Sequence, residues 1–366
     1  MISKLYTCAA NQNISEAQYD FGTIYYLNTF VLCNMKLTLF YLELHARQYH
    51  VKALNSFGVI YCQGKLVQLD ANRGLSYLSR AADLGNIQSL YNLPVFYYQG
   101  NIVSRDINRS IYYLSQCLSW NFPNSKLFLG LIYYEDMHDI NKAIKYFTLG
   151  ANQNKTLAKY YLGEIYYFES QFFNTNKAIY YLTDAAASIL SAQFWLAIIY
   201  SSLNNKSDCN EKFLYYLTLA AKNDEIKAQM MLGWLYYVGI NVPRNANKAI
   251  DLLSRSSENG HKQADFILGY IYQVENDASK SISHYKEASS FKDQYAKNNL
   301  GVIYKDGFGE FGKNIGLSIE YFTDGIRKYN DLLSMYNLAN MYLHKELIKN
   351  SIDKSIELLQ CFQRFL

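Results

Sequence analysis

A short phrase with the pattern A-x-x-x-L-G-x-x-Y recurs along the whole chain, and its clearest copy is AKYYLGEIY at 158–166. The tyrosine that ends the phrase occurs in ten copies, separated by 32 to 38 residues and most often by 36. Internal repeats of this length are typical of solenoids, in which each unit stacks on its neighbours. The ten tyrosines are Tyr25, Tyr61, Tyr97, Tyr133, Tyr166, Tyr200, Tyr236, Tyr272, Tyr304 and Tyr342.

A second phrase lies between the copies of the first, as in KAIKY at 142–146 followed by Gly150-Ala151. Apolar residues in both phrases recur three and four positions apart, which is the spacing of one face of an α-helix. Small residues in both phrases allow two helices to approach closely. We therefore predict an all-α fold: one α-solenoid domain over 1–366, with a lone leading helix at 1–12 and ten antiparallel helix pairs over 13–366.

Composition agrees with a helical core and excludes several classes of protein. Hydrophobic residues make up 50% of the chain and charged residues 18%, which excludes a disordered chain. The net charge is only +4 and basic residues cluster as pairs at most, so we expect no nucleic-acid partner. The six cysteines form no CxxC motif and have no histidine at zinc-ligand spacing, which predicts free core thiols.

The first eleven residues lack the basic, apolar and small-residue regions of a cleavable signal peptide, which favours a cytoplasmic location. One uncharged stretch, 185–205, is long enough to test as a membrane span. It contains several Ser, Asn and Gln residues and lies in register with the repeat. We therefore assign it to a repeat helix and expect no membrane span.

Together, the two phrases and the period resemble the Sel-1-like repeat family, which is related to tetratricopeptide repeats. The best copy is AQMMLGWLYYVGINVPRNANKA at 228–249, which also matches the usual connecting loop of the family. The resemblance implies a non-catalytic scaffold that holds other proteins. The family is associated with adaptor roles in signalling, cell-wall synthesis and protein quality control.

Within the family, residues 212–361 look like the middle repeats of the lumenal adaptor subunit of the ER-associated degradation ubiquitin-ligase complex. That likeness implies a ubiquitin-ligase or membrane-protein complex as partner and an ER-associated location. The alternative is a regulator or effector of signalling that captures proteins through the same repeats. The residues alone do not separate these two functions.

Motifs of catalysis and cofactor binding are weak in this sequence. Residues 307–312 spell G-x-G-x-x-G, but a repeat helix rather than a strand is predicted before them, which favours a turn. There is no HExxH pair and no G-x-S-x-G elbow, although spacing alone leaves open a triad assembled by the fold. We assign no catalytic, cofactor-binding or metal-binding residue, expect no small-molecule substrate, and predict that the chain is not an enzyme.

A second tyrosine directly follows the repeat tyrosine in five copies. A helix turns by about 100° per residue, so this second ring is displaced sideways from the core position. One hypothesis places the rings in a ladder that binds protein partners, because tyrosine is enriched in interfaces. The other packs them between adjacent repeats. The five residues are Tyr26, Tyr98, Tyr134, Tyr167 and Tyr237.

Pro94 replaces the glycine of the first phrase in one repeat. Proline removes an amide donor from a helix and clashes with the preceding turn. This position therefore predicts a first helix that is kinked or begins late, with a hinge at that repeat.

Overall fold

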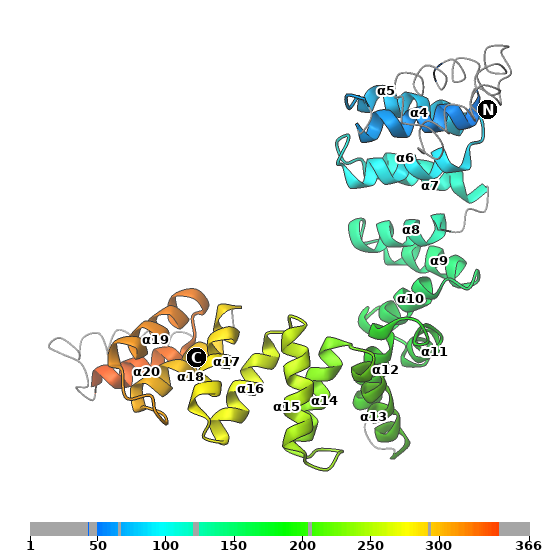
Figure 1. Ribbon diagram of the computed structural model, residues 1–366. Coiled ribbons are helices and arrows are strands. Elements are labelled where there is room, and N and C mark those ends of the chain that lie inside the picture. The colour runs from blue at the N-terminus through cyan, green and yellow to red at the C-terminus, as the bar shows by residue number, and fades with distance from the viewer. Residues whose placement is uncertain are drawn as a thin grey trace, which may run out of the picture. The chain divides into compact units, whose positions relative to one another are not determined.

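The computed structural model describes residues 43, 50–64, 67–119, 124–203, 207–291 and 294–343. These residues are predominantly helical, which confirms the predicted all-α solenoid class (Figure 1). The predicted leading helix at 1–12 and the repeat around Tyr25 lie outside the described residues.

The chain forms two compact units, residues 1–185 and 186–366. Unit 1 contains α4 (Val51–Gln63), α5 (Ala71–Asp83), α6 (Ile87–Gln99), α7 (Ile107–Ser119), α8 (Ser125–Leu131) with a π-helical turn η1 (Ile132–Asp136), α9 (Ile140–Ala151), α10 (Thr156–Phe168) and α11 (Thr175–Ala185). Unit 2 contains α12 (Leu190–Ser202), α13 (Ser207–Lys222), α14 (Ile226–Val238), α15 (Ala246–Glu258), α16 (Gln263–Val274), α17 (Ala278–Ser290), α18 (Gln294–Asp306), α19 (Ile315–Tyr329) and α20 (Leu332–Leu343).

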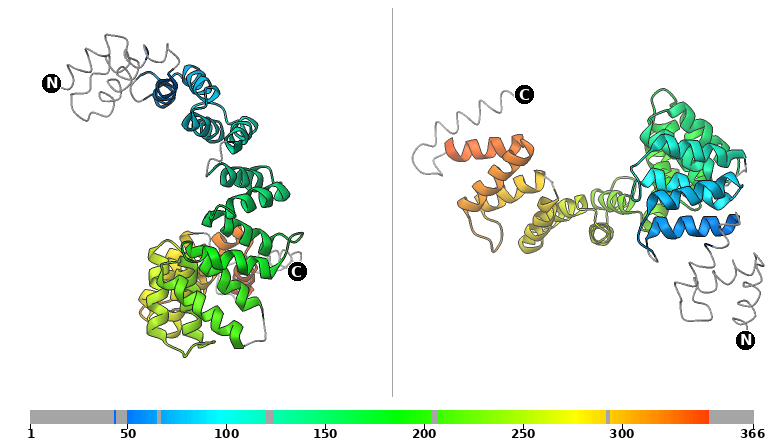
Figure 2. Two further views of the ribbon diagram at one scale, coloured as in Figure 1. Left: turned by 90° about the vertical axis from the view of Figure 1, so that its right-hand side faces the viewer. Right: turned by 90° about the horizontal axis from the view of Figure 1, so that it is seen from above.

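Within each unit, consecutive helices pack as pairs. The first helix of a pair carries the LG phrase, and the second carries the phrase with the small-residue pair. Each pair then packs on the next one, as the side-by-side helices of Figure 2 show. The described residues hold eight complete pairs, and α20 is the first helix of a ninth. A single continuous solenoid over both units stays a prediction.

The glycine of the LG step lets the two helices of a pair come into contact. A Cβ atom on Gly163 of α10 would lie 2.4 Å from Leu182 Cγ of α11. At the same position in α18, a Cβ on Gly301 would lie 2.5 Å from the Phe322 ring. Leu182 and Phe322 are fully buried. The glycine therefore makes room for a large core side chain of the second helix, as the pattern predicts.

The repeat tyrosine stacks on a ring of the second helix. Tyr133 and Tyr146 have centroids 5.5 Å apart and planes 5° apart. Lys142, one turn before Tyr146, places its Nζ 5.0 Å from the Tyr133 centroid. A cation over a ring contributes about 0.5–1 kcal/mol at an exposed site. The stacked pairs are Tyr61–Tyr77, Tyr97–Tyr113, Tyr133–Tyr146, Tyr166–Tyr181, Tyr200–Tyr216, Tyr272–His284 and Tyr304–Tyr321.

The carbonyl of the repeat tyrosine fixes where the second helix begins. Tyr97 O accepts a hydrogen bond of 2.8 Å from the Asp106 amide, and Tyr272 O accepts one of 2.9 Å from the Asp277 amide. Both aspartates cap the second helix, because their carboxylates accept a bond from the amide three residues later. The connection is nine positions long in the first case and five in the second, yet it ends in the same bond.

Pro94 lies inside α6, which begins at Ile87 behind its Asn86 cap and runs unbroken to Gln99. The predicted late start is therefore wrong. Proline cannot donate to the Leu90 carbonyl, but the Cys117 thiol of α7 donates to it at 3.2 Å. Burial raises the pKa of Cys117 to about 11, so the thiol keeps its proton at neutral pH. The side chain of α7 thus replaces the missing backbone donor.

Residues 190–202 of the uncharged stretch form α12, a first helix that packs on α13. None of the described helices combines the length and apolarity that crossing a bilayer requires. Cys62 and Cys117 are free and buried, as predicted, and Cys209 is free and half-buried.

We expect Gly163→Ala to destabilise unit 1, because the added methyl group would overlap Leu182. Overpacking of this kind costs about 1–3 kcal/mol. Gly316→Ala is the matched control, because Gly316 is also helical but has room for a methyl group. The atom nearest to a Cβ added there is Asn314 Oδ1, at 3.5 Å. Urea unfolding followed by circular dichroism measures both variants. An unchanged midpoint for Gly163→Ala would contradict the close-contact role.

Cys117→Ala is expected to cost about 1–3 kcal/mol, because it leaves the buried Leu90 carbonyl without a donor. In a Pro94→Ala background the residue 94 amide can donate to Leu90, so the same change should cost about 1 kcal/mol less. A double-mutant cycle on urea midpoints measures this coupling. Strictly additive effects would show that the thiol does not compensate for the proline.

Candidate functional site

Four of the five predicted second tyrosines lie on described first helices, and Tyr26 lies outside the described residues. Tyr98 and Tyr167 lie in the last turns of α6 and α10, Tyr134 in η1, and Tyr237 in α14. The first three are half-buried, whereas Tyr237 is only 9% exposed.

Three of these rings contact the first helix of the following repeat. Tyr98 meets the edge of Phe128 in α8, with centroids 5.1 Å apart. The half-buried rings therefore combine packing between repeats with an exposed part. Their use as a partner-binding face stays a prediction. The other contacts of this kind are Tyr134–Tyr161 and Tyr237–Tyr270.

Two arginines that sequence reasoning missed hold the second tyrosines in place. Arg105 donates from Nε to the Tyr98 carbonyl at 3.0 Å, and its guanidinium carbon lies 4.9 Å from the Tyr98 centroid. Arg244 repeats both contacts with Tyr237, at 3.2 Å and 5.6 Å. Each arginine is therefore fixed by a carbonyl and a ring of the preceding first helix.

A sequence signal for these arginines existed in the connecting loops. They lie directly before the cap of the second helix, in VSRD at 103–106 and VPRN at 242–245. In a third repeat, Phe173 precedes the cap Asn174, and its ring lies 6.2 Å from that of Tyr167. The residue before the cap is thus a regular neighbour of the second tyrosine.

The two arginines differ in their electrostatic surroundings. The Arg105 guanidinium pairs with Asp136, which comes from η1 of the next repeat and is mostly buried. No ion pair joins Arg244 to a carboxylate in the part of the chain that the structure describes. Glu275 holds the position of Asp136 in the next repeat, six residues after the LG glycine, but is exposed. Arg244 therefore has no carboxylate within ion-pair distance among the described residues, although Glu275 lies near enough to act electrostatically on the same Tyr237 ring.

Exposed apolar side chains surround Tyr237, the ring that carries Arg244. Trp234 and Tyr270 are 38% and 41% exposed, and their rings lie 5.9 Å and 6.3 Å from that of Tyr237. Val238 and Val274, one turn further along α14 and α16, are also exposed. The first helices α14 and α16, labelled in Figure 1, thus carry aromatic and aliphatic groups around the ring that holds Arg244.

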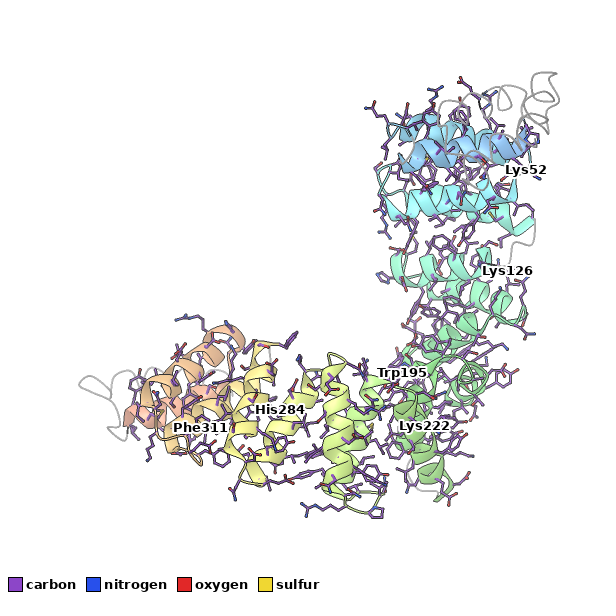
Figure 3. All side chains as sticks on the ribbon, viewed as in Figure 1. Lys52, Lys126, Trp195, Lys222, His284 and Phe311 are labelled. Carbon is purple, nitrogen blue, oxygen red and sulfur yellow. The ribbon has the colours of Figure 1, made fainter. Side chains whose placement is uncertain are left out.

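In one repeat a histidine replaces the stacking tyrosine of the second helix. His284, labelled in Figure 3, stacks on Tyr272 with centroids 5.5 Å apart. Its Nδ1 lies 2.9 Å from Oδ1 of Asp265, which is almost fully buried. Burial alone would raise the pKa of Asp265, but the hydrogen bond with His284 and the nearby Lys262 ammonium contribute to lowering it, so the pKa lies below its usual range. The pair links α16 to α17.

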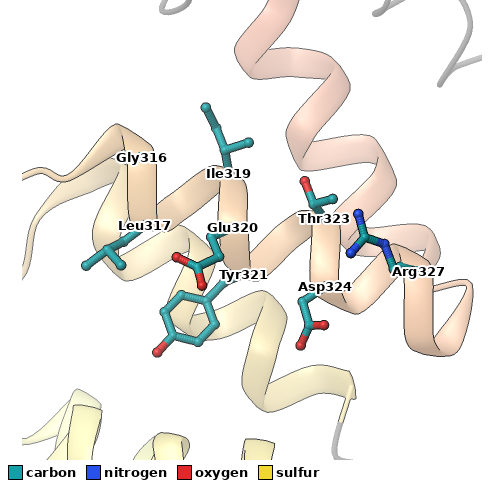
Figure 4. Close-up of a pocket in the computed structure, with 8 residues that line it drawn as sticks. All are labelled: Gly316, Leu317, Ile319, Glu320, Tyr321, Thr323, Asp324 and Arg327. Atoms are coloured by element: carbon teal, nitrogen blue, oxygen red, sulfur yellow. The ribbon is translucent and has the colours of Figure 1, made fainter.

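One hollow of the described surface lies along a single helix. It has a volume of about 470 Å³ and is lined by residues of α19 alone (Figure 4). Its Asp324 pairs with Lys297 and Lys328. The 307–312 motif is a turn between α18 and α19, in which Phe308 and Phe311 exchange backbone hydrogen bonds. Among the described residues, no three His, Cys, Asp or Glu side chains are grouped as metal ligands.

The Asp265 pair predicts an acid-dependent contribution to stability. A carboxyl group whose pKa is lowered by folding stabilises the fold above its unfolded pKa of about 4, and this contribution is lost as the pH falls through the folded pKa. We expect Asp265→Asn to lower the melting temperature by several degrees at pH 7 and by less at pH 3.

Thermal unfolding at both pH values measures this difference. Asp251→Asn is the control, because Asp251 is an exposed carboxylate of α15. It should leave the melting temperature unchanged at both pH values. An Asp265→Asn effect that is the same at pH 3 and pH 7 would contradict the assignment.

Comparisons with known proteins agree with the repeat geometry. The Sel1 repeat pattern matches residues 51–86, 87–116, 123–155, 156–188, 226–261, 294–323 and 332–361, which is well over half of the chain. The comparison with curated protein sequences finds no match.

Two solved structures are similar in fold. The protective antigen c5321 of uropathogenic Escherichia coli, which displays an SLR fold, is 20% identical with a TM-score of 0.70, over 98% of this chain and 79% of that one. A Sel1 repeat protein from Oxalobacter formigenes is 22% identical with a TM-score of 0.72, over 82% of this chain and 90% of that one. The repeat matches show that the chain belongs to the Sel1 repeat family.

Proposed function

We propose that this chain is a non-enzymatic scaffold that binds other proteins through its repeat surfaces. The observation that carries the proposal is the succession of Sel1 repeats, each built around the same helix-pair core. Stacked repeats present long surfaces whose exposed residues vary from copy to copy. Exposed aromatic residues such as Trp234 and Tyr270 on first helices suit such a surface, because aromatic side chains are enriched in interfaces.

We further propose that the scaffold is an adaptor in ER-associated protein degradation. The likeness of residues 212–361 to the middle repeats of the lumenal adaptor supports this role. Its partners would be a ubiquitin-ligase or membrane-protein complex, and its location would be the ER. A cytoplasmic location, with signalling proteins as partners, would instead support the regulator or effector. Cell fractionation with an antibody against the chain separates the two.

Affinity capture with mass spectrometry tests the scaffold and its tyrosine face. The baits are the wild-type chain and a Tyr98→Ala, Tyr134→Ala, Tyr167→Ala variant. We expect the variant to lose at least one partner by fivefold or more, because a central interface aromatic contributes more than about 1 kcal/mol. If the alanine variant unfolds, a variant with leucine at the same three positions, which keeps apolar packing, replaces it as the bait.

The matched control removes three tyrosines from second helices. Tyr112, Tyr180 and Tyr215 are 59%, 67% and 63% exposed, so their replacement by alanine should leave the fold and the captured partners unchanged. Equal capture by all baits would refute the tyrosine face but not the scaffold. A well-folded wild-type bait that captures nothing specific would refute the scaffold.

A further inference from the structure

We propose that a surface of α14, α16 and the loop before α15 binds a peptide segment of a partner protein in which an acidic side chain lies next to an apolar one. This surface, here named the Arg244 surface, consists of Trp234, Val238, Arg244, Tyr270 and Val274. The inference rests on the proposed scaffold function and names the chemistry of one partner segment.

The guanidinium of Arg244 is already positioned to bind a ligand. Its Nε donates a hydrogen bond to the Tyr237 carbonyl, and the guanidinium lies over the Tyr237 ring. The two terminal nitrogens point away from that carbonyl bond in the planar fork of the group and carry donors for a carboxylate. A fixed side chain loses little conformational entropy when a partner binds.

The chain itself shows which chemical group fits this arrangement. Arg105 makes the same carbonyl and ring contacts in its repeat, and its guanidinium forms an ion pair with the carboxylate of Asp136. In the repeat of Arg244, the corresponding Glu275 is exposed and makes no ion pair with it among the described residues. The guanidinium of Arg105 in unit 1 is therefore paired with a carboxylate, whereas the guanidinium of Arg244 in unit 2 has no such pair among the described residues.

The apolar part of the surface defines the neighbouring residue of the ligand. Trp234, Arg244 and Tyr270 lie 5.9 Å, 5.6 Å and 6.3 Å from the Tyr237 ring centroid. Consecutive residues of a peptide have Cα atoms about 3.8 Å apart. An acidic residue on Arg244 thus brings an adjacent Leu, Phe or similar side chain onto Trp234 or Tyr270. Trp, Tyr and Arg are the residue types most enriched at interface hot spots.

A random octapeptide library displayed on phage, selected on the immobilised full chain, tests the proposal. We expect enriched peptides to share Asp or Glu next to a large apolar residue. The best such peptide, made synthetically with a fluorophore, should bind about tenfold more weakly to Arg244→Ala and to Trp234→Ala in fluorescence anisotropy. Replacing its acidic residue by Lys should abolish binding to wild type and restore part of it to Arg244→Glu.

Arg105→Ala is the matched control, since Arg105 makes the same local contacts but is already paired. The Arg105→Ala variant should bind the peptide with unchanged affinity. The Glu275→Gln variant should bind it with the same or a higher affinity. Circular dichroism verifies that each variant is folded, and Arg244→Lys, which keeps the charge, should bind more tightly than Arg244→Ala.

Three outcomes would overturn the inference. Enriched peptides without an acidic residue, or with affinities that Arg244→Ala and Trp234→Ala leave unchanged, would refute the Arg244 surface while the scaffold function stands. A dimer in analytical ultracentrifugation that Trp234→Ala dissociates would show that a second copy of the chain covers the surface. Failure of a folded chain to select any peptide would refute the inference, whereas the scaffold function is judged separately by capture of intact proteins.

Discussion

The contact between the LG glycine of the first helix and a large buried side chain of the second brings the backbones of a helix pair close together. Because Gly163 has no side chain, Leu182 can fill the space against the backbone of α10. The two helices are then close enough for Tyr166 and Tyr181 to stack, with Lys177 over the Tyr166 ring. The same stack also forms in two repeats without this glycine, at Tyr97–Tyr113 where Pro94 holds the position and at Tyr200–Tyr216 where Ala197 holds it. Glycine, alanine and proline at this position are therefore all compatible with the tyrosine stack.

Sequence reasoning identified the class of fold because a period of about 36 residues with helical spacing admits few other structures. It also placed the glycine at the contact between the two helices of a pair, since this position repeats. The start of α6 could not be predicted from Pro94 alone, because the Asn86 cap and the Cys117 thiol lie elsewhere in the chain. A local rule about proline does not include a donor from the neighbouring helix.

The candidate site was predicted less completely than the fold. The rotation of a helix places a second tyrosine beside the core, but it does not say what covers the ring. Tyr237 is nearly buried because Arg244 returns from the loop and Tyr270 approaches from the next repeat. Both neighbours depend on the path of the loop and on the stacking of repeats, which a single repeat does not encode. Divergence between copies, as at Asp136 and Glu275, then gives equivalent positions different surface chemistry.

The bond from the repeat tyrosine carbonyl to the cap of the second helix has an evolutionary consequence. Among the described residues this bond anchors both ends of seven connecting loops, whether the intervening chain is as short as that before Asp277 or as long as that before Asn314. Loop closure depends only weakly on length, so residues can be gained or lost there at little cost to the helix pair. The loops can therefore acquire new recognition segments by insertion, much as hypervariable loops do on a constant framework.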